Sequence, residues 1–581
     1  MANVEHLKAN SAALRGPLAE ELSQSASGFS AAGAGILKFH GMYQQENRDA
    51  RQTRKQEAQG KAHSFMVRTR VPGGRVTPQQ YLAQDEIATQ FGDGSLRLTT
   101  RQDFQLHGVL KSDLRATLQS IASSLMTTFA ACGDVVRNVV CCPYPVADHL
   151  EREIWHQVTT LARHLEPKTQ AYSEIWLDGE KAADVGAPEA EPLYGKTYLP
   201  RKFKIGVALP WDNCVDILVQ DLGFVAITNG THILGYNVYV GGGLGMTHNK
   251  PATFPALGQA LAWMTSAQVL EVATAIVAIF RDWGDRENRK HARIKYLVAE
   301  KGVGWFRQEL STRLGYDLVL PRPVTISDAH SHLGWHAQEN GLWSLGVYVE
   351  SGRIRDAESQ QTRTAFRRIA EHVRPGIRLT ADQNILFSDI RESQRHEVDA
   401  ILREYGVAPV ENITPLRQRA LACPALPTCG LALSEAERFM PSLLPQLDHA
   451  LSTLGLGNEA PVVRITGCPN GCARPYTAEI GIVGRSGDNY ALYLGGSHLG
   501  TRLGFSVADL VPSKEIVSTL YPVLIAFRTE RQSGERLGDF CHRLGAERVR
   551  QIMSGTAAID SHVGVSAIQL EESRPQEVTV A

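Results

Sequence analysis

Two kinds of hydrophobic pattern alternate along this chain. Short runs rich in Val and Ile are typical of buried strands, whereas residues 150–165 and 434–454 form longer amphipathic runs with the spacing of helices. This alternation predicts an α/β or α+β protein. No stretch approaches the roughly 18 apolar residues that a membrane-spanning helix needs, so we expect no membrane partner.

The two ends of the chain differ from this pattern. The first 35 or so residues are rich in Ala, Ser and Gly and predict an extended or loosely packed arm, in which residues 17–22 could form a short helix. The last ten residues read as a tail. The N-terminus lacks a basic segment followed by an apolar run, so we expect a cytoplasmic protein.

Two short patterns occur twice, in the same order, about 250–280 residues apart. Residues 97–102 (RLTTRQ) return as residues 378–383 (RLTADQ), and residues 236–242 (YNVYVGG) return as residues 490–496 (YALYLGG). We interpret these matches as an ancient duplication. Two related halves would be joined by a pseudo-twofold axis, with a central cleft suited to a cofactor.

Charge and cysteine content narrow the functional classes. Sixty basic residues against sixty-one acidic ones leave no global field that would hold nucleic acid. Hydrophobic residues at 43% and charged residues at 21% are ordinary for a folded globular chain. Nine cysteines are an odd number, which disfavours a secreted disulfide framework and favours thiols that are reduced or bound to metal.

Four of the cysteines form two pairs that carry the strongest chemical signal. The first pair is Cys423 and Cys429, and the second is Cys468 and Cys472, separated by Pro-Asn-Gly. Proline fixes φ and glycine accepts positive φ, so this tight turn could aim both thiols of the second pair inward. Spacing alone favours an iron–sulfur cluster but leaves open a tetrahedral zinc site or unrelated buried cysteines.

The second pair lies within Thr-Gly-Cys-Pro-Asn-Gly-Cys-Ala-Arg-Pro (466–475), which resembles the cluster signature of the siroheme-dependent sulfite and nitrite reductases. The resemblance extends from about residue 40 to about residue 545 and includes HGMYQQ (40–45), LPRKFK (199–204) and GDF (538–540). It implies duplicated ferredoxin-like half-domains and two siroheme and 4Fe–4S reductase domains related by pseudo-twofold symmetry.

The resemblance also implies a division of the chain. We expect an N-terminal arm (1–60), a first ferredoxin-like half-domain (61–135), a first reductase domain (136–328), a second half-domain (329–408), a second reductase domain with the cluster cysteines (409–570) and a tail (571–581).

By resemblance, Cys423, Cys429, Cys468 and Cys472 bind a 4Fe–4S cluster, and the Cys472 thiolate bridges to the siroheme iron. The cofactor-binding residues expected in this way are Arg97, Arg101, Asn470 and Cys472. Siroheme carries many carboxylates, so burying it requires charge-assisted donors.

The substrate that the resemblance implies is a small oxyanion, and the resemblance assigns Arg68, Arg137, Lys202 and Lys204 to its binding. The two lysines are two residues apart, so on a strand both side chains would leave the same face. Because arginine stays protonated, we assign proton delivery to the lysines and anion binding mainly to the arginines. His107 is expected either to approach the cofactor or to be a core histidine.

A glycine-rich turn at residues 241–245 follows an apolar strand. It lacks the lysine and hydroxyl residue of a P-loop and the spacing of a dinucleotide fingerprint, so we expect a turn that permits close approach of a cofactor. We find no NADPH or flavin site. Electrons should therefore come from a partner, either a flavoprotein that uses NADPH or a ferredoxin, with the flavoprotein slightly favoured.

The predicted activity is the six-electron reduction of sulfite to sulfide in sulfate assimilation and cysteine biosynthesis. The filling of the first cysteine pair and the presence of both lysines favour sulfite, because nitrite reductases of the family tend to have a neutral residue where Lys204 stands. The alternative is a siroheme nitrite reductase that forms ammonia. An electron-transfer or zinc protein without siroheme would leave the basic residues unexplained.

Overall fold

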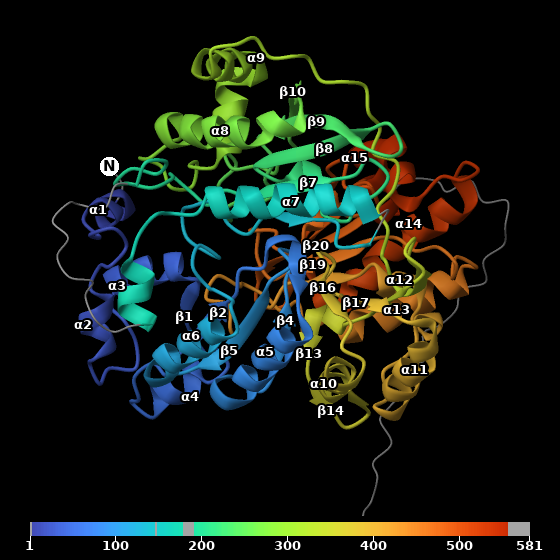
Figure 1. Ribbon diagram of the computed structural model, residues 1–581. Helices are drawn as coiled ribbons and strands as arrows, with labels where there is room; N and C mark the ends of the chain where they lie inside the picture. The colour runs from blue at the N-terminus through green and yellow to red at the C-terminus, as the bar shows by residue number, and fades with distance from the viewer. Residues whose placement is uncertain (1–2, 146–147, 178–190, 556–581) are drawn as a thin grey trace, which may run out of the picture.

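The computed structural model describes residues 3–145, 148–177 and 191–555. Across these residues the chain forms four five-stranded sheets that fall into two related pairs (Figure 1). Within each pair, one sheet comes mainly from the first half of the chain and the other from the second half. The mixed α/β class and the duplicated architecture predicted from the sequence are confirmed.

The first pair of sheets is antiparallel and has exchanged strands. One has the order β1-β2-β5-β4-β13 and the other β11-β12-β17-β16-β3. Their strands are β1 (Met42–Glu46), β2 (His63–Arg68), β3 (Arg75–Val76), β4 (Leu96–Leu98), β5 (Phe104–Val109), β11 (Gly334–Ala337), β12 (Trp343–Val347), β13 (Arg353–Ile354), β16 (Gly376–Leu379) and β17 (Ile385–Ile390). β13 pairs with β4, and β3 pairs with β16, so each half supplies the edge strand of the other half's sheet.

The second pair combines parallel and antiparallel strands in the same way. The orders are β10-β9-β8-β7-β6 and β18-β19-β20-β21-β22. The strands are β6 (Val140–Cys141), β7 (Ile205–Ala208), β8 (Leu222–Thr228), β9 (Ile233–Val240), β10 (Gln259–Met264), β18 (Leu421–Ala422), β19 (Val463–Thr466), β20 (Ile480–Ser486), β21 (Asn489–Leu494) and β22 (Phe505–Pro512). In both sheets the first three strands in chain order run parallel and the last two add antiparallel.

Corresponding helices cover the two halves (Figure 1). The antiparallel sheets carry α5 (Pro78–Phe91), α6 (Leu114–Ser123), α10 (Thr362–His372) and α11 (Arg395–Glu404). The mixed sheets carry α7 (Asp148–His164), α8 (Val269–Trp283), α9 (Ile294–Leu314), α13 (Met440–Thr453), α14 (Ile516–Glu530) and α15 (Leu537–Met553). The helices predicted at 150–165 and 434–454 correspond to α7 and α13. α13 starts later because residues 434–439 form turns.

The repeated sequence patterns occupy equivalent places. Gln102 and Gln383 both have positive φ, at 58° and 63°. A Cβ added to Gly74 would lie 2.4 Å from the Leu379 carbonyl oxygen, and one added to Gly352 would lie 2.7 Å from that of Leu98. Each turn therefore approaches the opposite half so closely that only glycine fits.

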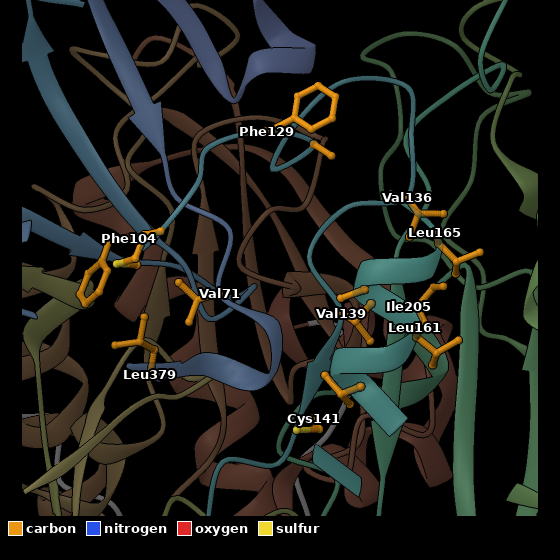
Figure 2. Close-up of a cluster of buried hydrophobic side chains, with 14 of the residues drawn as sticks. Val71, Phe104, Phe129, Val136, Val139, Cys141, Leu161, Leu165, Ile205 and Leu379 are labelled. Atoms are coloured by element: carbon orange, nitrogen blue, oxygen red, sulfur yellow. The ribbon is translucent and has the colours of Figure 1, made fainter. Parts of the chain in front are cut away.

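One large apolar core joins the two antiparallel sheets to the first mixed sheet. Figure 2 shows Val71 and Phe104 from the first half beside Leu379 from the second half. The same figure shows Leu161 of α7 near Ile205 of β7. A second core lies around α13, α14 and α15. Because the main core contains residues of both halves, it holds the two antiparallel sheets and the first mixed sheet in place relative to one another.

The N-terminal segment is more ordered than the sequence suggested. It forms α1 (Asn3–Ala9), α2 (Leu18–Leu22) and α3 (Ala31–Leu37), and Leu18 and Ile36 are fully buried. The buried Lys8 ammonium donates a hydrogen bond to the Leu199 carbonyl oxygen at 2.7 Å. The expectation of a loose arm was wrong because a few apolar residues and this buried lysine anchor it, although the short helix near residues 17–22 is present.

Neither the predicted tail (571–581) nor the end of the last predicted domain lies within the described residues. Among the helices that the structure does describe, none is both long enough and apolar enough to cross a bilayer.

Candidate active site

The four paired cysteines meet at one edge of the second mixed sheet. Cys423 follows β18, and Cys468 and Cys472 follow β19, its parallel neighbour. The carboxyl ends of parallel strands lie at the same edge, so both pairs are brought together. Burial raises the pKa of Cys423 and Cys429, and the nearby Cys472 raises both further. Burial and Cys472 likewise raise the pKa of Cys468 to about 12.

Local turns aim donors at these sulfur atoms. The Gly467 N–H donates to the Cys423 Sγ at 3.3 Å, and the Asn470 side-chain amide donates to the Cys468 Sγ at 3.6 Å. Asn470, expected at the cofactor, thus lies against Cys468, one of the four paired cysteines. Gly467 is required here because a Cβ would lie 2.4 Å from the Ser434 carbonyl oxygen. N–H groups that point at sulfur are suited to hold thiolates rather than thiols.

Cys472 differs from its partners in exposure and in its neighbours. It is exposed, whereas the other eight cysteines are buried or partly buried. The Thr100 hydroxyl donates to the Cys472 carbonyl oxygen at 3.2 Å. Cys472 also acts electrostatically on Lys204. Cys472 therefore interacts electrostatically both with the other three paired cysteines and with Lys204, one of the predicted basic residues.

The four residues predicted to bind the anion converge on one region. Arg68 ends β2, and Arg137 lies next to an isolated bridge between Val136 and Phe203. The Arg137 N–H donates to the Phe203 carbonyl oxygen at 2.9 Å. Phe203 is buried between Lys202 and Lys204, so the extended backbone turns both lysines away from the core, toward Arg137. Lys202 interacts electrostatically with Lys204, and both lysines interact with Arg137, as side chains on a common face would.

Burial and neighbouring positive charges destabilise the protonated form of both lysines. Burial and the neighbouring Lys204 and Arg137 hold the pKa of Lys202 well below its usual range. Burial, together with Arg101 and Arg293, lowers the pKa of Lys204 to about 7. Neither ammonium donates a hydrogen bond to another group within the described part of the chain, so both remain available to an anion.

The two arginines keep their charge in the same surroundings. Burial opposes the charge of Arg137, but Tyr43 and Cys132 more than offset it and raise its pKa. For Arg68, burial is likewise outweighed by Cys132 and Asp103, which raise its pKa. Arg137 also donates to the Tyr43 hydroxyl at 3.4 Å. The site thus combines two fixed cations with two lysines that can release protons.

Arg97 is placed on the cluster side of the site. It donates to the Ala422 carbonyl oxygen at 2.8 Å, directly before Cys423, and forms an ion pair with Glu437. The Glu437 N–H in turn donates to the Cys423 carbonyl oxygen at 3.1 Å. Arg353 of β13 binds the same carboxylate at 2.7 Å. The contacts of Arg97 hold the loop that carries Cys423, and neither Glu437 nor Arg353 lies in a motif found in the sequence.

Arg101 and His107 leave polar atoms unpaired. Arg101 donates to the Gln220 side chain at 2.7 Å and to the Ile205 carbonyl oxygen at 3.0 Å, and its Nε finds no partner among the described residues. Neither ring nitrogen of the buried His107 is paired within those residues either. Burial, with Arg353 and Arg97 nearby, holds the pKa of His107 well below its usual range, so the imidazole is neutral.

The glycine-rich turn packs directly on the second cysteine pair. The Met246 N–H donates to the Pro469 carbonyl oxygen at 2.8 Å. The Lys295 ammonium donates to the carbonyl oxygens of Gly243 at 3.0 Å and Gly245 at 2.8 Å. The turn predicted from the sequence thus joins the first mixed sheet to the cluster loop, and Lys295 had no sequence signal.

An ion-pair network fixes the chain just after Cys472. Arg474, which has φ of 61°, forms ion pairs with Asp216 at 2.9 Å and Asp382 at 2.8 Å. Arg464 of β19 binds the same Asp216 at 2.5 Å. Arg474 belongs to the signature at residues 466–475, so the sequence did point to this residue. Both acidic partners come from distant segments: Asp382 lies in the repeated pattern at residues 378–383, whereas Asp216 lies in no motif found in the sequence.

Comparison with known families agrees with this arrangement. The profile described as "Nitrite/Sulfite reductase ferredoxin-like half domain" matches residues 57–124 and 336–405. The profile described as "Nitrite and sulphite reductase 4Fe-4S domain" matches residues 156–318 and 463–558. The fold and the cysteine-bearing edge therefore define a nitrite and sulfite reductase type of protein.

Similarity to individual proteins is more specific. The chain is 43% identical to the Staphylococcus saprophyticus "Sulfite reductase (NADPH) hemoprotein beta-component", over 94% of this chain and 96% of that protein. Proteins of the same name from Paenibacillus sp. and Methylobacterium nodulans are 44% and 46% identical, over 95% and 93% of this chain and 97% and 90% of theirs. The chain belongs to the family of these hemoprotein beta-components.

A solved structure supports the fold. The Mycobacterium tuberculosis NirA protein superposes with a TM-score of 0.74 at 25% identity, covering 90% of this chain and 92% of that one.

Proposed function

We propose that this chain is the hemoprotein component of a sulfite reductase, which reduces sulfite to hydrogen sulfide with a 4Fe–4S cluster and siroheme. The proposal rests on two sets of residues that meet at one place. The basic group consists of Arg68, Arg137, Lys202 and Lys204, and the cysteine group consists of Cys423, Cys429, Cys468 and Cys472. Lys204 of the basic group interacts electrostatically with Cys472 of the cysteine group. The name shared by the relatives supports sulfite as the substrate.

The cysteine group fits a 4Fe–4S cluster. Four thiols lie close enough for Cys472 to raise the pKa of the other three, so their joint ionisation requires a bound cation. The N–H donors to Cys423 and Cys468 stabilise thiolate charge. The match to a 4Fe–4S domain favours this group over zinc, the alternative that cysteine spacing had left open.

The region beside Cys472 fits siroheme. Arg101 Nε and both ring nitrogens of His107 are buried and unpaired within the described residues, which suits contact with a polar prosthetic group. Arg68, Arg137 and Lys204 supply positive charge against its carboxylates and the substrate. When bound, siroheme and the cluster supply electrons to the substrate. Arg97 would act mainly by holding the cluster loop, because its donors already bind Ala422 and Glu437.

The basic residues would divide the remaining work. Arg68 and Arg137 stay protonated, so they would bind and orient the sulfite oxygens. Lys202 and Lys204 have lowered pKa values, so they would donate protons to oxygens that leave as water. Reduction of sulfite consumes six electrons and seven protons and yields hydrosulfide and three waters, so proton supply is as necessary as electron supply.

Electrons would come from a separate protein. The name of the relatives includes NADPH, which favours a flavoprotein partner over a ferredoxin. We propose a reducing compartment, the cytoplasm, because the nine cysteines, all within the described residues, form no disulfide. We also propose the domain division at residues 61–135, 136–328, 329–408 and 409–570, which places most strands of each five-stranded sheet in one unit; β1 precedes residue 61, and β3 and β13 pair with the sheet of the other half.

Nitrite reduction is the second candidate, because the matching family profiles include both activities. Four basic residues in one region, of which Arg68 and Arg137 stay protonated, favour the more highly charged sulfite over the singly charged nitrite.

The proposal is tested on anaerobically purified protein. The visible spectrum should contain siroheme bands, and reduced methyl viologen should drive formation of sulfide from sulfite. A colourless protein, or a siroheme protein that forms no sulfide, would contradict it. Parallel assays with an NADPH flavoprotein reductase and with reduced ferredoxin identify the donor, and faster turnover with ferredoxin would overturn the favoured partner.

A further inference from the structure

Four potential metal ligands outside the proposed active site meet in a buried cluster. Cys142 directly follows β6, Asp212 and Cys214 lie in the turns after β7, and His332 lies in the segment before β11. All four are buried, and one ligand atom from each lies within 4.8 Å of the others. None of them belongs to the four-cysteine group or to the basic group.

The polar atoms of the cluster already face one another. The Asp212 Oδ2 lies 2.6 Å from the Cys142 Sγ and 2.8 Å from the His332 Nε2. The Cys142 Sγ lies 3.5 Å from the same His332 nitrogen. In a tetrahedral zinc site, with ligands about 2.0–2.3 Å from the ion, neighbouring ligand atoms are about 3.3–3.8 Å apart. Small side-chain shifts would therefore open the cluster enough to admit an ion.

Neighbouring groups orient these ligands. The second oxygen of Asp212 accepts a hydrogen bond from the Cys214 N–H at 3.2 Å, which leaves Oδ2 directed into the cluster. The Tyr144 N–H donates to the Cys142 Sγ at 3.4 Å. The Tyr144 ring stacks on His332 at 4.7 Å between centroids. Such outer contacts fix ligand orientation around protein-bound zinc.

We propose that Cys142, Asp212, Cys214 and His332 form a structural zinc site. Two thiolates, one imidazole and one carboxylate match the ligand preferences of zinc, and four protein ligands leave no open position for catalysis. Two of the ligands are thiolates, so zinc is favoured over magnesium or calcium, which take oxygen ligands.

The site would fasten an extended connection to the first mixed sheet. The segment before His332 already runs along the turns after β7, because the Ser327 N–H donates to the Pro210 carbonyl oxygen at 2.8 Å and the Asn213 N–H to that of Asp328 at 2.9 Å. The Cys214 carbonyl oxygen accepts from Arg474 at 3.2 Å. Zinc would thus fix both the connection between the two halves and the arginine that follows the Cys472 loop.

The test is metal analysis of the holoenzyme, purified anaerobically from cells grown with zinc. We expect about one zinc per chain in addition to the cluster and siroheme iron. X-ray absorption at the zinc edge should show two sulfur ligands at about 2.3 Å and two nitrogen or oxygen ligands at about 2.0–2.2 Å. Zinc-free protein with full iron content, another metal in the site, or a Cys142–Cys214 disulfide found by mass spectrometry would overturn the proposal.

Variants locate the ion. Cys214→Ala and His332→Ala should lose the zinc, whereas the matched control Cys141→Ala should keep it. Cys141 adjoins Cys142 but belongs to the main core, where Figure 2 shows its side chain among apolar residues. Zinc that persists in both ligand variants would overturn the assignment. If the variants fail to fold, the X-ray absorption spectrum of the unaltered protein decides whether zinc is bound by two sulfur ligands and two nitrogen or oxygen ligands. Iron content and sulfite turnover are measured in parallel, so that a failure of the zinc proposal can be distinguished from a failure of the proposed sulfite reduction.

Discussion

The hydroxyl of Thr100 donates a hydrogen bond to the carbonyl oxygen of Cys472 at 3.2 Å, so a turn of the first half holds the cluster loop of the second half. Arg101, the next residue, interacts electrostatically with Lys204, and so does Cys472. The two halves therefore share one site. The duplicated fold makes this possible because its related turns lie against each other.

Removing this hydrogen bond should loosen the cluster loop. A hydrogen bond is worth about 0.5–1.5 kcal/mol, so we expect Thr100→Ala to release iron to a chelator about two- to tenfold faster. The rate is measured from the loss of visible absorbance. Thr529→Ala is the control, because its hydroxyl bonds only within its own helix. Equal rates for both variants would remove Thr100 from this role.

Cys472→Ser should abolish sulfite reduction, because a hydroxyl is a poor ligand for iron centres that prefer thiolate. Cys541→Ala, which alters a buried cysteine of the C-terminal core, should retain activity if it folds. Iron content, the visible spectrum and turnover are measured for both. A Cys472→Ser protein with intact cofactors and near-normal turnover would exclude this thiolate from the centre.

Arg68→Ala and Arg137→Ala should weaken sulfite binding while iron content is retained, since each removes an anion donor rather than an iron ligand. Loss of one charge-assisted bond, worth about 1.5–3 kcal/mol, predicts a ten- to hundredfold rise in KM for sulfite. Arg403→Ala, at an exposed position of α11, is the control. Unchanged KM and turnover in either variant would place that arginine outside the site.

Activity should depend on the protonation of Lys204. Burial, with Arg101 and Arg293, lowers its pKa to about 7, so kcat/KM for sulfite should fall as the pH rises above that value. Lys204→Arg stays protonated, so this fall should weaken while kcat drops about tenfold or more through loss of the proton donor. Bisulfite also titrates near neutral pH, so profiles are recorded for nitrite as well. A sulfite profile that falls equally steeply in Lys204→Arg and in the unaltered protein would contradict the role of Lys204, because the titration of bisulfite is common to both.

The sequence predicted the architecture because duplication left local signs. The two repeated patterns sit at equivalent strands, and the signature at 466–475 contains two of the cluster cysteines. The exchange of β3 and β13 could not be predicted, since each strand has two residues and pairs only with the opposite half. Pairing of this kind depends on tertiary packing rather than on local preference.

The candidate site could likewise be predicted only where its residues lie in local sequence motifs. Residues in recognisable motifs, such as Lys204 and Cys472, could be predicted as candidate site residues, whereas Glu437 and Asp216 act through contacts with distant segments. The cluster of Cys142, Asp212, Cys214 and His332 also has no compact motif, because its ligands come from three separate stretches of chain. The buried Lys8 shows that a small polar anchor can order a segment with a composition typical of a loose arm.

In the proposed mechanism, the basic residues beside Cys472 bind and protonate sulfite. The most direct test is kcat/KM for sulfite and for nitrite in the unaltered protein and in Lys204→Asn, with methyl viologen as donor so that partner docking does not intervene. Lys301→Asn, at an exposed position, is the control. Sulfite is doubly charged and loses three oxygens, so its kcat/KM should fall about ten- to a hundredfold in Lys204→Asn and that for nitrite much less. Equal losses for the two anions would contradict the claim and assign Lys204 to the fold or the cofactor.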